Sequence, residues 1–217
     1  MTSSTSEPLV LWSDSLWESP WVFSCFVVLE EKGLRYEARL LSLAKGEARR
    51  GDYALRSLTG RVPALQHGDF WLSESSAIDE YLEDVFPPPR WARLYPEDLR
   101  QRARARQVQA WLRTDLMPLR QARPTTTLFL GEPASPLGPE ARESAERLLR
   151  IADQLVSSDD TSIFGSFTVA DADLALALQR LVHGGDPVPE RMRRYAQAVW
   201  ARPSVRGFVE KPRPKER

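Results

Sequence analysis

Residues 9–40 read LVLWSDSLWESPWVFSCFVVLEEKGLRYEARL, and this stretch decides the fold of the first part of the chain. It begins with the apolar run Leu9–Trp12, which predicts a buried strand that ends in a polar loop. Ser19 and Pro20 then open a segment with apolar side chains at helical spacing, and Gly33 follows its last turn. Serine, proline and glycine are preferred, in that order, at the N-cap, the first helical position and the left-handed stop of a helix. The pattern therefore predicts a strand, a loop and a helix with both ends marked.

A second strand is predicted over Tyr36–Leu40, and the order strand, helix, strand indicates a right-handed unit with parallel strands. The pair Gly68–Asp69 lies between the short apolar segments 60–66 and 70–72, which is typical of a β-hairpin. An amphipathic helix with capping residues at its start follows over about 73–85. The first part is therefore expected to be an α/β unit of order βαβ-ββα with a mixed sheet.

A proline-rich stretch, Phe86–Arg90, interrupts the chain after this unit. Proline disfavours helix at the residue before it, so such a stretch is typical of a linker. Strand signals almost vanish beyond it. We therefore expect an α/β domain over 1–86, a linker over 87–97 and an all-helical domain over 98–217.

The second domain shows helical periodicity throughout. One helix is predicted from Leu99 to about Gln121, with Pro118 expected to kink or end it. Another follows Pro139, and a third begins at Thr168–Asp171, a sequence that fits a capping box with Asp at its fourth position. The body of this third helix is apolar nearly all round, which is typical of a buried central helix. Two more helices are predicted, around 192–200 and 204–210.

Composition limits the classes of function. The chain has 217 residues, 30 Lys plus Arg against 30 Asp plus Glu, and a formal net charge of zero. It therefore has no long-range field to attract nucleic acid or an anionic membrane, and the basic run 99–106 is interpreted as a solvated or subunit-facing surface. No apolar run approaches the roughly 20 residues that cross a bilayer. The N-terminal residues carry no basic group ahead of their apolar stretch, so we expect a cytosolic protein rather than a secreted one.

Cysteine and histidine are scarce. Cys25 is the single cysteine, which excludes an intrachain disulfide and a thiolate zinc cluster, and it is interpreted as an inert core thiol. His67 and His183 are the two histidines, so a histidine-rich metal site is excluded and a Ser-His-Asp triad is disfavoured. No metal is expected. The reactive group of an enzyme with this composition must come largely from a substrate or cosubstrate.

Three motifs carry a resemblance to a known family. They are Arg61-Val62-Pro63, then Glu74-Ser75 nine residues after Leu65, and Thr168–Asp171 in the helical half. In this order the chain resembles the glutathione transferases over nearly its whole length. The resemblance implies a thioredoxin-like first domain, an all-helical second domain, glutathione as cosubstrate and a homodimer. The stretches LWSD, LSESSAIDEYLED, RARARQVQAWLR and LMPLR are similar to a bacterial branch with glutathione-dependent peroxidase or transferase activity.

The resemblance implies that a hydroxyl at the start of the first helix lowers the pKa of the glutathione thiol, and Ser19 is the residue we expect to do so. A cysteine-like thiol has a pKa near about 8.5, and each unit of lowering requires about 1.4 kcal/mol. A charge-assisted hydrogen bond supplies roughly 1.5 to 3 kcal/mol and a helix N-terminus roughly 0.3 to 1. Ser13 and Ser15, in the same loop, are alternatives, and a further alternative is that Ser19 only caps the helix.

Glu74 and Ser75 resemble the family's clamp for the γ-glutamyl group. The Ser75 hydroxyl and the helix N-terminus would bind the α-carboxylate, and the Glu74 carboxylate would balance the ammonium. Val62 resembles the residue whose backbone pairs with the cysteinyl part of glutathione, next to a proline, here Pro63, that is cis in the family. The alternatives are a capped surface helix with an acidic first turn and an ordinary strand-opening proline.

Two classes of function fit these residues. The first is an enzyme in which the glutathione thiolate attacks a hydroperoxide or a small electrophile, with glutathione-assisted isomerisation as a variant. The second is a non-catalytic module that uses the same fold to bind other proteins. The chain retains a donor serine, Glu74-Ser75 and Val62-Pro63, which favours the enzyme. Trp17 and Trp21 flank Ser19 and would either line an apolar second-substrate pocket or pack in the core.

Overall fold

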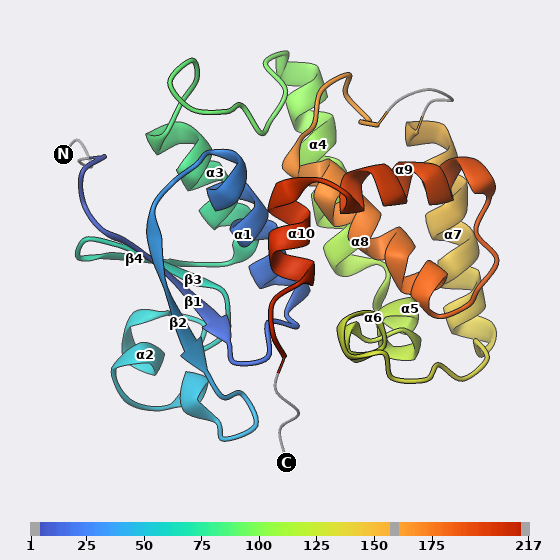
Figure 1. The fold of residues 1–217 in the computed structure, drawn as a ribbon, viewed down its shortest axis with the longest axis horizontal. Helices are drawn as coiled ribbons and strands as arrows, with labels where there is room; N and C mark the ends of the chain where they lie inside the picture. The colour runs from blue at the N-terminus through green and yellow to red at the C-terminus, as the bar shows by residue number, and fades with distance from the viewer. Residues whose placement is uncertain (1–4, 157–160, 214–217) are drawn as a thin grey trace. The chain divides into compact units, whose positions relative to one another are not determined.

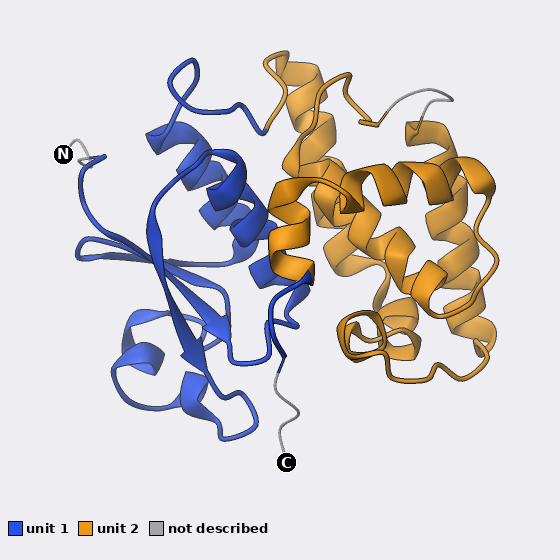
Figure 2. Ribbon diagram, in the orientation of Figure 1, with its two compact units in different colours: residues 1–94, 210–217 blue, residues 95–209 orange. Residues whose placement is uncertain are grey.

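The computed structural model of the chain describes residues 5–156 and 161–213 (Figure 1). The chain divides into two compact units (Figure 2). The first contains residues 1–94 and 210–217, and the second contains residues 95–209. The division after Leu94 falls inside the stretch 87–97, and the last residues of the chain group with the first unit rather than with the helices that precede them.

The first unit is a four-stranded mixed sheet with helices, which confirms the predicted thioredoxin-like fold. The strand order is β2-β1-β3-β4, with β1 parallel to β2 and antiparallel to β3, and with β4 antiparallel to β3. The elements, in chain order, are β1 (Leu9–Asp14), α1 (Pro20–Glu31), β2 (Tyr36–Leu41), η1 (Glu47–Arg49), α2 (Gly51–Arg56), β3 (Ala64–His67), β4 (Phe70–Ser73) and α3 (Ser75–Val85).

Helix α1 has the ends that the sequence predicts. Ser19 is its N-cap, Pro20 is its first residue, and Gly33 has φ +61 just beyond its C-terminus. Every residue from Val22 to Leu29 is buried, so α1 is the core helix of this unit. It packs against α3, where the Ser24 hydroxyl donates a hydrogen bond of 3.0 Å to the Asp79 carboxylate. The predicted hairpin is also present, with β3 and β4 joined at Gly68 and Asp69.

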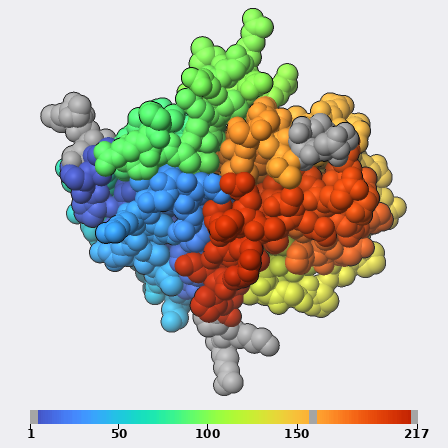
Figure 3. All heavy atoms as spheres, turned by 45° about the horizontal axis from the view of Figure 1, so that its top comes forward, coloured from blue at the N-terminus to red at the C-terminus, as the bar shows by residue number. Residues whose placement is uncertain are grey.

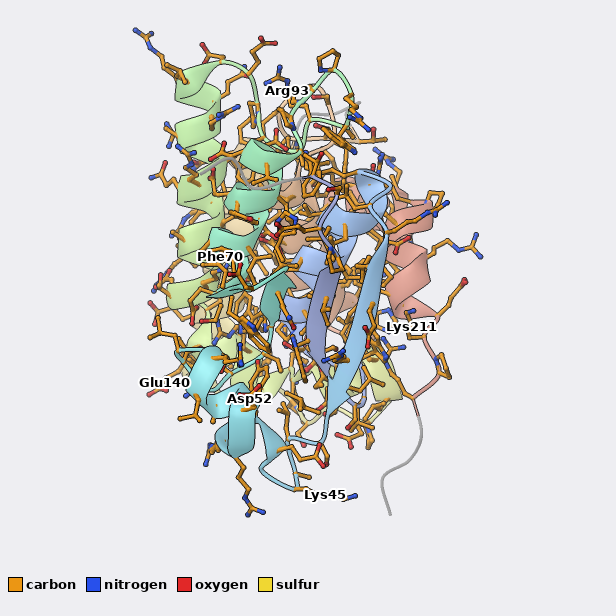
Figure 4. The ribbon with its side chains drawn as sticks, turned by 90° about the vertical axis from the view of Figure 1, so that its left-hand side faces the viewer. Lys45, Asp52, Phe70, Arg93, Glu140 and Lys211 are labelled. Carbon is orange, nitrogen blue, oxygen red and sulfur yellow. The ribbon has the colours of Figure 1, made fainter. Side chains whose placement is uncertain are left out.

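Two short elements, η1 and α2, are absent from the predicted order. Local signals could not reveal α2, because it has only six residues and begins at a glycine with φ +60. Tertiary packing holds it instead. The ring of Tyr53 in α2 lies 5.2 Å from that of Trp12 in β1 and 6.1 Å from that of Trp71 in β4, centroid to centroid. Figure 4 shows Lys45 and Asp52 at this end of the unit, away from Phe70 at the hairpin.

The second unit contains helices joined by loops, with no strand among its described residues. Its central helix α8 is buried at every residue from Val169 to Leu181 and packs against α4, α6, α7 and α9, as the all-round apolar pattern predicted. The outer face of α9, coloured red-orange, is visible on the surface in Figure 3. The helices are α4 (Leu99–Thr114), α5 (Met117–Ala122), α6 (Thr125–Leu130), α7 (Pro139–Leu155), α8 (Val169–His183), α9 (Glu190–Trp200) and α10 (Pro203–Val209).

The single helix predicted over 99–121 is two helices. The break falls at Asp115 and Leu116, and Pro118 lies in the first turn of α5 instead of kinking or ending a long helix. Proline is tolerated there because the first N–H groups of a helix have no intrahelical partner. Asp115 stabilises the break through hydrogen bonds from Trp111 Nε1 at 2.9 Å and Arg147 Nη1 at 2.8 Å. Helix α6, only six residues long, was not predicted.

Candidate functional site

The register of the sheet brings the three predicted site segments of the first unit to one edge. Ala64, the first residue of β3, pairs with Trp12 near the end of β1 and with Ser73 at the end of β4. The loop after β1, the residues before β3 and the residues after β4 therefore meet at the same edge. These are the segments that carry Ser19, Val62–Pro63 and Glu74–Ser75.

Ser19 is both a helix cap and an available hydroxyl donor. Its Oγ accepts a hydrogen bond of 3.3 Å from the backbone N–H of Val22. Accepting this bond uses an oxygen lone pair and leaves the hydroxyl hydrogen to donate elsewhere. The capping role and the thiolate-donor role are therefore compatible, because they use different parts of the same group.

Ser13 and Ser15, the alternatives to Ser19, are placed differently. Ser13 is fully buried, and its hydroxyl donates to the backbone carbonyl of Asp14 at 3.1 Å. Its hydrogen is therefore engaged inside the protein. Ser15 is half-buried, and its backbone N–H donates to Leu41 O at 2.9 Å. The geometry favours Ser19 over Ser13, and Ser15 remains an alternative.

Asp14 is a candidate site residue that the sequence analysis missed. Its carboxylate is 2% exposed and accepts hydrogen bonds from the backbone N–H groups of Glu18 at 2.8 Å and Ser19 at 3.1 Å. It therefore fixes the loop that leads to Ser19. An aspartate at the end of a strand commonly bonds to backbone N–H groups a few residues on, and that tendency was the available signal.

Glu74 has a backbone conformation that is uncommon for a residue with a side chain. It occupies the N-cap position of α3 with φ 73 and ψ 114. Such a conformation costs on the order of 1 to 3 kcal/mol and is concentrated at ligand sites and active sites. The Glu74 side chain is exposed, whereas Ser75, the first residue of α3, is 4% exposed. The pair therefore presents an accessible carboxylate beside a helix N-terminus and a hydroxyl.

The peptide bond between Val62 and Pro63 is cis, the isomer that the resemblance implies. Val62 is 9% exposed, and it precedes β3, whose ladder begins at Ala64. The peptide groups of Val62 thus lie just beyond the sheet hydrogen bonds, at the edge where an added strand would continue the pairing.

Other residues considered from the sequence have structural surroundings. Trp17 is 6% exposed, and its ring packs edge-on against Phe26 at 5.8 Å, which favours core packing over a pocket wall. Cys25 is buried, with its Sγ 3.7 Å from Ser75 O. His67 is buried and its Nδ1 shares a hydrogen bond of 2.8 Å with the Tyr81 hydroxyl. Burial lowers the pKa of His183.

Two kinds of feature are absent from residues 5–156 and 161–213. Three or more His, Cys, Asp or Glu side chains placed to hold a metal ion do not occur among these residues. Within the same residues, every helix is too short or too polar to cross a membrane.

Family models match both halves of the chain. The model described as "Glutathione S-transferase, N-terminal domain" matches residues 18–85, and the one described as "Glutathione S-transferase, C-terminal domain" matches residues 98–212. Among curated proteins, glutathione S-transferase 1 of Dianthus caryophyllus is 34% identical over 55% of this chain and 52% of its own length. The chain thus aligns with about half of the length of the first such relatives.

Solved structures align over more of the chain. A glutathione transferase homologue from Burkholderia gl BGR1, crystallised with bound glutathione, is 42% identical, with a TM-score of 0.78 over 94% of this chain and 97% of its own. A maleylacetoacetate isomerase from Methylobacterium extorquens AM1, with bound malonate and glutathione, is 25% identical, with a TM-score of 0.72 over 94% of this chain and 98% of its own.

Proposed function

Because the chain belongs to the glutathione S-transferase family, we propose that it is an enzyme that binds glutathione at the sheet edge of its first unit and uses the glutathione thiolate as a nucleophile. The observation that carries this proposal is the meeting, at that edge, of the segments that carry Ser19, Val62 and the Glu74–Ser75 pair. The 42% identical homologue that binds glutathione supports it.

In this proposal Ser19 activates the thiol. Its hydroxyl hydrogen donates to the sulfur, and the N-terminus of α1 adds a favourable partial charge. Together these supply roughly 2 to 4 kcal/mol, which corresponds to a thiol pKa lowered by about one and a half to three units, of which the hydroxyl accounts for about one to two. Asp14 keeps the backbone of Ser19 in place through its hydrogen bond to Ser19 N–H, 3.1 Å long.

The other site residues bind and orient the tripeptide. The N-terminus of α3 and the Ser75 hydroxyl bind the γ-glutamyl carboxylate, and Glu74 balances the neighbouring ammonium. The peptide groups of Val62 pair with the cysteinyl residue as a short added strand. This arrangement places the sulfur near the start of α1.

Two reactions are open to such a thiolate. With an electrophilic carbon, the sulfur forms a C–S bond while the leaving group departs with its bonding electrons. With a hydroperoxide, the sulfur attacks one oxygen, the O–O bond breaks, and the alkoxide takes a proton to become an alcohol. The resulting glutathione sulfenic acid condenses with a second glutathione thiol, which yields glutathione disulfide and water. Peroxidase and conjugation chemistry would therefore share this site.

The proposal is tested by binding to immobilised glutathione, followed by assays with cumene hydroperoxide, a chloronitrobenzene and maleylacetoacetate. We expect retention on the resin and turnover with at least one of the first two substrates. Turnover of maleylacetoacetate alone would assign glutathione-assisted isomerisation. Neither binding nor turnover would overturn the proposal in favour of a non-catalytic interaction module.

Replacement of Glu74 by glutamine is expected to weaken glutathione binding. The change removes a charge-assisted interaction with the ammonium, worth roughly 1.5 to 3 kcal/mol, so the KM for glutathione rises about 10-fold or more. Because this contact is equal in the ground and transition states, kcat changes little. Asp84→Asn, an exposed charge removal on the same helix, is the control. A Glu74→Gln variant with the KM of the control would contradict the clamp.

We also propose a cytosolic homodimer with no nucleic-acid or membrane partner. The zero net charge supports the absence of nucleic-acid and membrane partners. Phe70 supports the dimer, because its apolar side chain is 46% exposed on β4, an edge strand of the sheet. A single species of 24.7 kDa in a solution mass measurement would contradict the dimer.

A further inference from the structure

The last described residues of the chain contact the loop that leads to Ser19. After α10, residues 210–213 belong to the first unit, and Lys211 is labelled at this point in Figure 4. The guanidinium of Arg213 donates two hydrogen bonds to the backbone carbonyl of Trp17, from Nε at 3.3 Å and from Nη2 at 3.0 Å. Its Nη1 donates to Lys211 O at 2.9 Å. A side chain 196 positions away thus holds a backbone carbonyl two residues before Ser19.

Lys211 adds a second contact to the same loop. Its ammonium lies 4.9 Å from the ring centroid of Trp17 and 5.3 Å from that of Phe26 in α1. Cation–π contacts of this kind contribute roughly 0.5 to 2 kcal/mol, depending on their exposure. The segment therefore binds both the backbone and the side chain of Trp17.

Burial and two neighbouring carboxylates act in opposite directions on the charge of Arg213. Burial lowers the pKa of Arg213, and the carboxylates of Asp14 and Glu18 act in the opposite direction. Asp14 is the residue that accepts hydrogen bonds from Glu18 N–H and Ser19 N–H. The loop is thus held both by Asp14 and by Arg213.

The loop contains a strained residue that these contacts stabilise. Trp17 has φ 51, a left-handed conformation that costs on the order of 1 to 3 kcal/mol for a residue with a side chain. Without contacts that hold it, the loop would relax toward a more extended backbone. Such a change two residues before Ser19 would move its hydroxyl, and a displacement of about 1 Å at a reacting group can cost roughly 100-fold in rate.

We propose that Arg213 is a positioning residue that fixes the Ser19 hydroxyl through the Trp17 carbonyl, and this rests on the proposed role of Ser19. Arg213 does not contact the thiol in this scheme. It restricts the loop Asp14–Ser19 so that the hydroxyl meets the sulfur without a further loss of conformational freedom. The C-terminal segment 210–213 is thereby part of the machinery of the first unit.

The test compares Arg213→Ala and Arg213→Lys with Arg35→Ala, an exposed arginine of the same unit. We expect Arg213→Ala to lower kcat/KM about 10-fold and to raise the pKa of the bound glutathione thiol, read from its ultraviolet thiolate absorbance. Arg213→Lys is expected to recover part of this loss, because it keeps the charge but not the forked pair of donors. Arg35→Ala should behave as wild type. Wild-type thiol pKa and kcat/KM in Arg213→Ala would overturn the proposal.

Three further variants separate the role of Arg213 from a loss of fold. A chain that ends after Arg213 should retain full activity, whereas a chain that ends after Glu210 should lose at least as much as Arg213→Ala, and melting temperatures show whether either has lost its fold. In the double variant Ser19→Ala/Arg213→Ala, the two effects should not add, because both act on one hydroxyl. Additive effects would overturn the positioning role. If Ser19→Ala leaves the thiolate unchanged, the proposed role of Ser19 has failed. If only Arg213→Ala leaves it unchanged, this inference alone has failed.

Discussion

Ser19→Ala is expected to remove most of the thiolate that bound glutathione carries at neutral pH. The variant keeps the fold of α1, because Pro20 and the buried face from Val22 to Leu29 remain, but it loses the hydrogen that donates to the sulfur. The thiol pKa should rise by about one to two units, which lowers the thiolate population and kcat/KM by roughly 10- to 100-fold below that pKa. The acid limb of the kcat/KM profile should move to higher pH by the same amount, since the reactive form is the deprotonated one.

The ultraviolet thiolate absorbance of bound glutathione measures this directly, with Ser13→Ala and Ser15→Ala as matched controls. Removal of the Ser19 cap also costs roughly 0.5 to 2 kcal/mol of stability, so unfolding is measured alongside. Ser13→Ala should retain most of the thiolate, because Ser13 donates its hydrogen to Asp14 O inside the protein, and Ser15→Ala should lose less thiolate than Ser19→Ala. A larger loss in either control would assign the activating hydroxyl to that residue and contradict the role of Ser19.

Asp171→Ala is expected to give the largest loss of stability. The Asp171 carboxylate is fully buried and accepts hydrogen bonds from Ile163 N, Tyr195 Oη, Thr168 N and Thr168 Oγ1, at 2.7 to 2.9 Å. Burial raises the pKa of Asp171, and these bonds act in the opposite direction. The alanine variant leaves several buried donors without an acceptor, each worth about 1 to 3 kcal/mol, so we expect a loss of roughly 3 to 5 kcal/mol.

Urea unfolding checks this expectation through the midpoint at unchanged slope. The control is Asp153→Ala in the same unit, whose side chain is 64% exposed in an ion pair with Arg191. Exposed pairs contribute about 0 to 1 kcal/mol, so the control should lie close to wild type. Equal midpoints for the two variants would show that the cap at Thr168–Asp171 is not a major source of stability.

The parts of this fold that the sequence predicted are those with strong local chemistry. Ser19, Pro20 and Gly33 mark the ends of α1, Gly68 marks the hairpin, and Asp171 marks the start of α8. Each of these residues acts on the backbone within a few positions of itself, so its effect can be predicted without knowledge of the tertiary structure. Long periodic helices were predictable for the same reason.

The parts that the sequence did not predict depend on distant partners. Helix α2 is held by Tyr53 against Trp12 and Trp71, and the break before Pro118 is held by Asp115. Six-residue helices are too short to persist on their own propensity, so packing decides them. The candidate site shows the same division. Ser19 was predicted as a cap and donor, but the loop geometry that presents it was not.

The sequence by itself determined the α/β and helical halves and the capped helices, because hydrophobic period and capping chemistry are local properties. The residues of a glutathione site were predicted from the resemblance to the family. Only the tertiary structure decided that the Ser13 hydroxyl donates its hydrogen bond to Asp14 O and that the Asp14 carboxylate accepts one from Ser19 N–H. It also decided that Arg213 returns to the Trp17 carbonyl. These are contacts between groups whose directions are set by the packed chain, and no spacing in the sequence encodes such a direction.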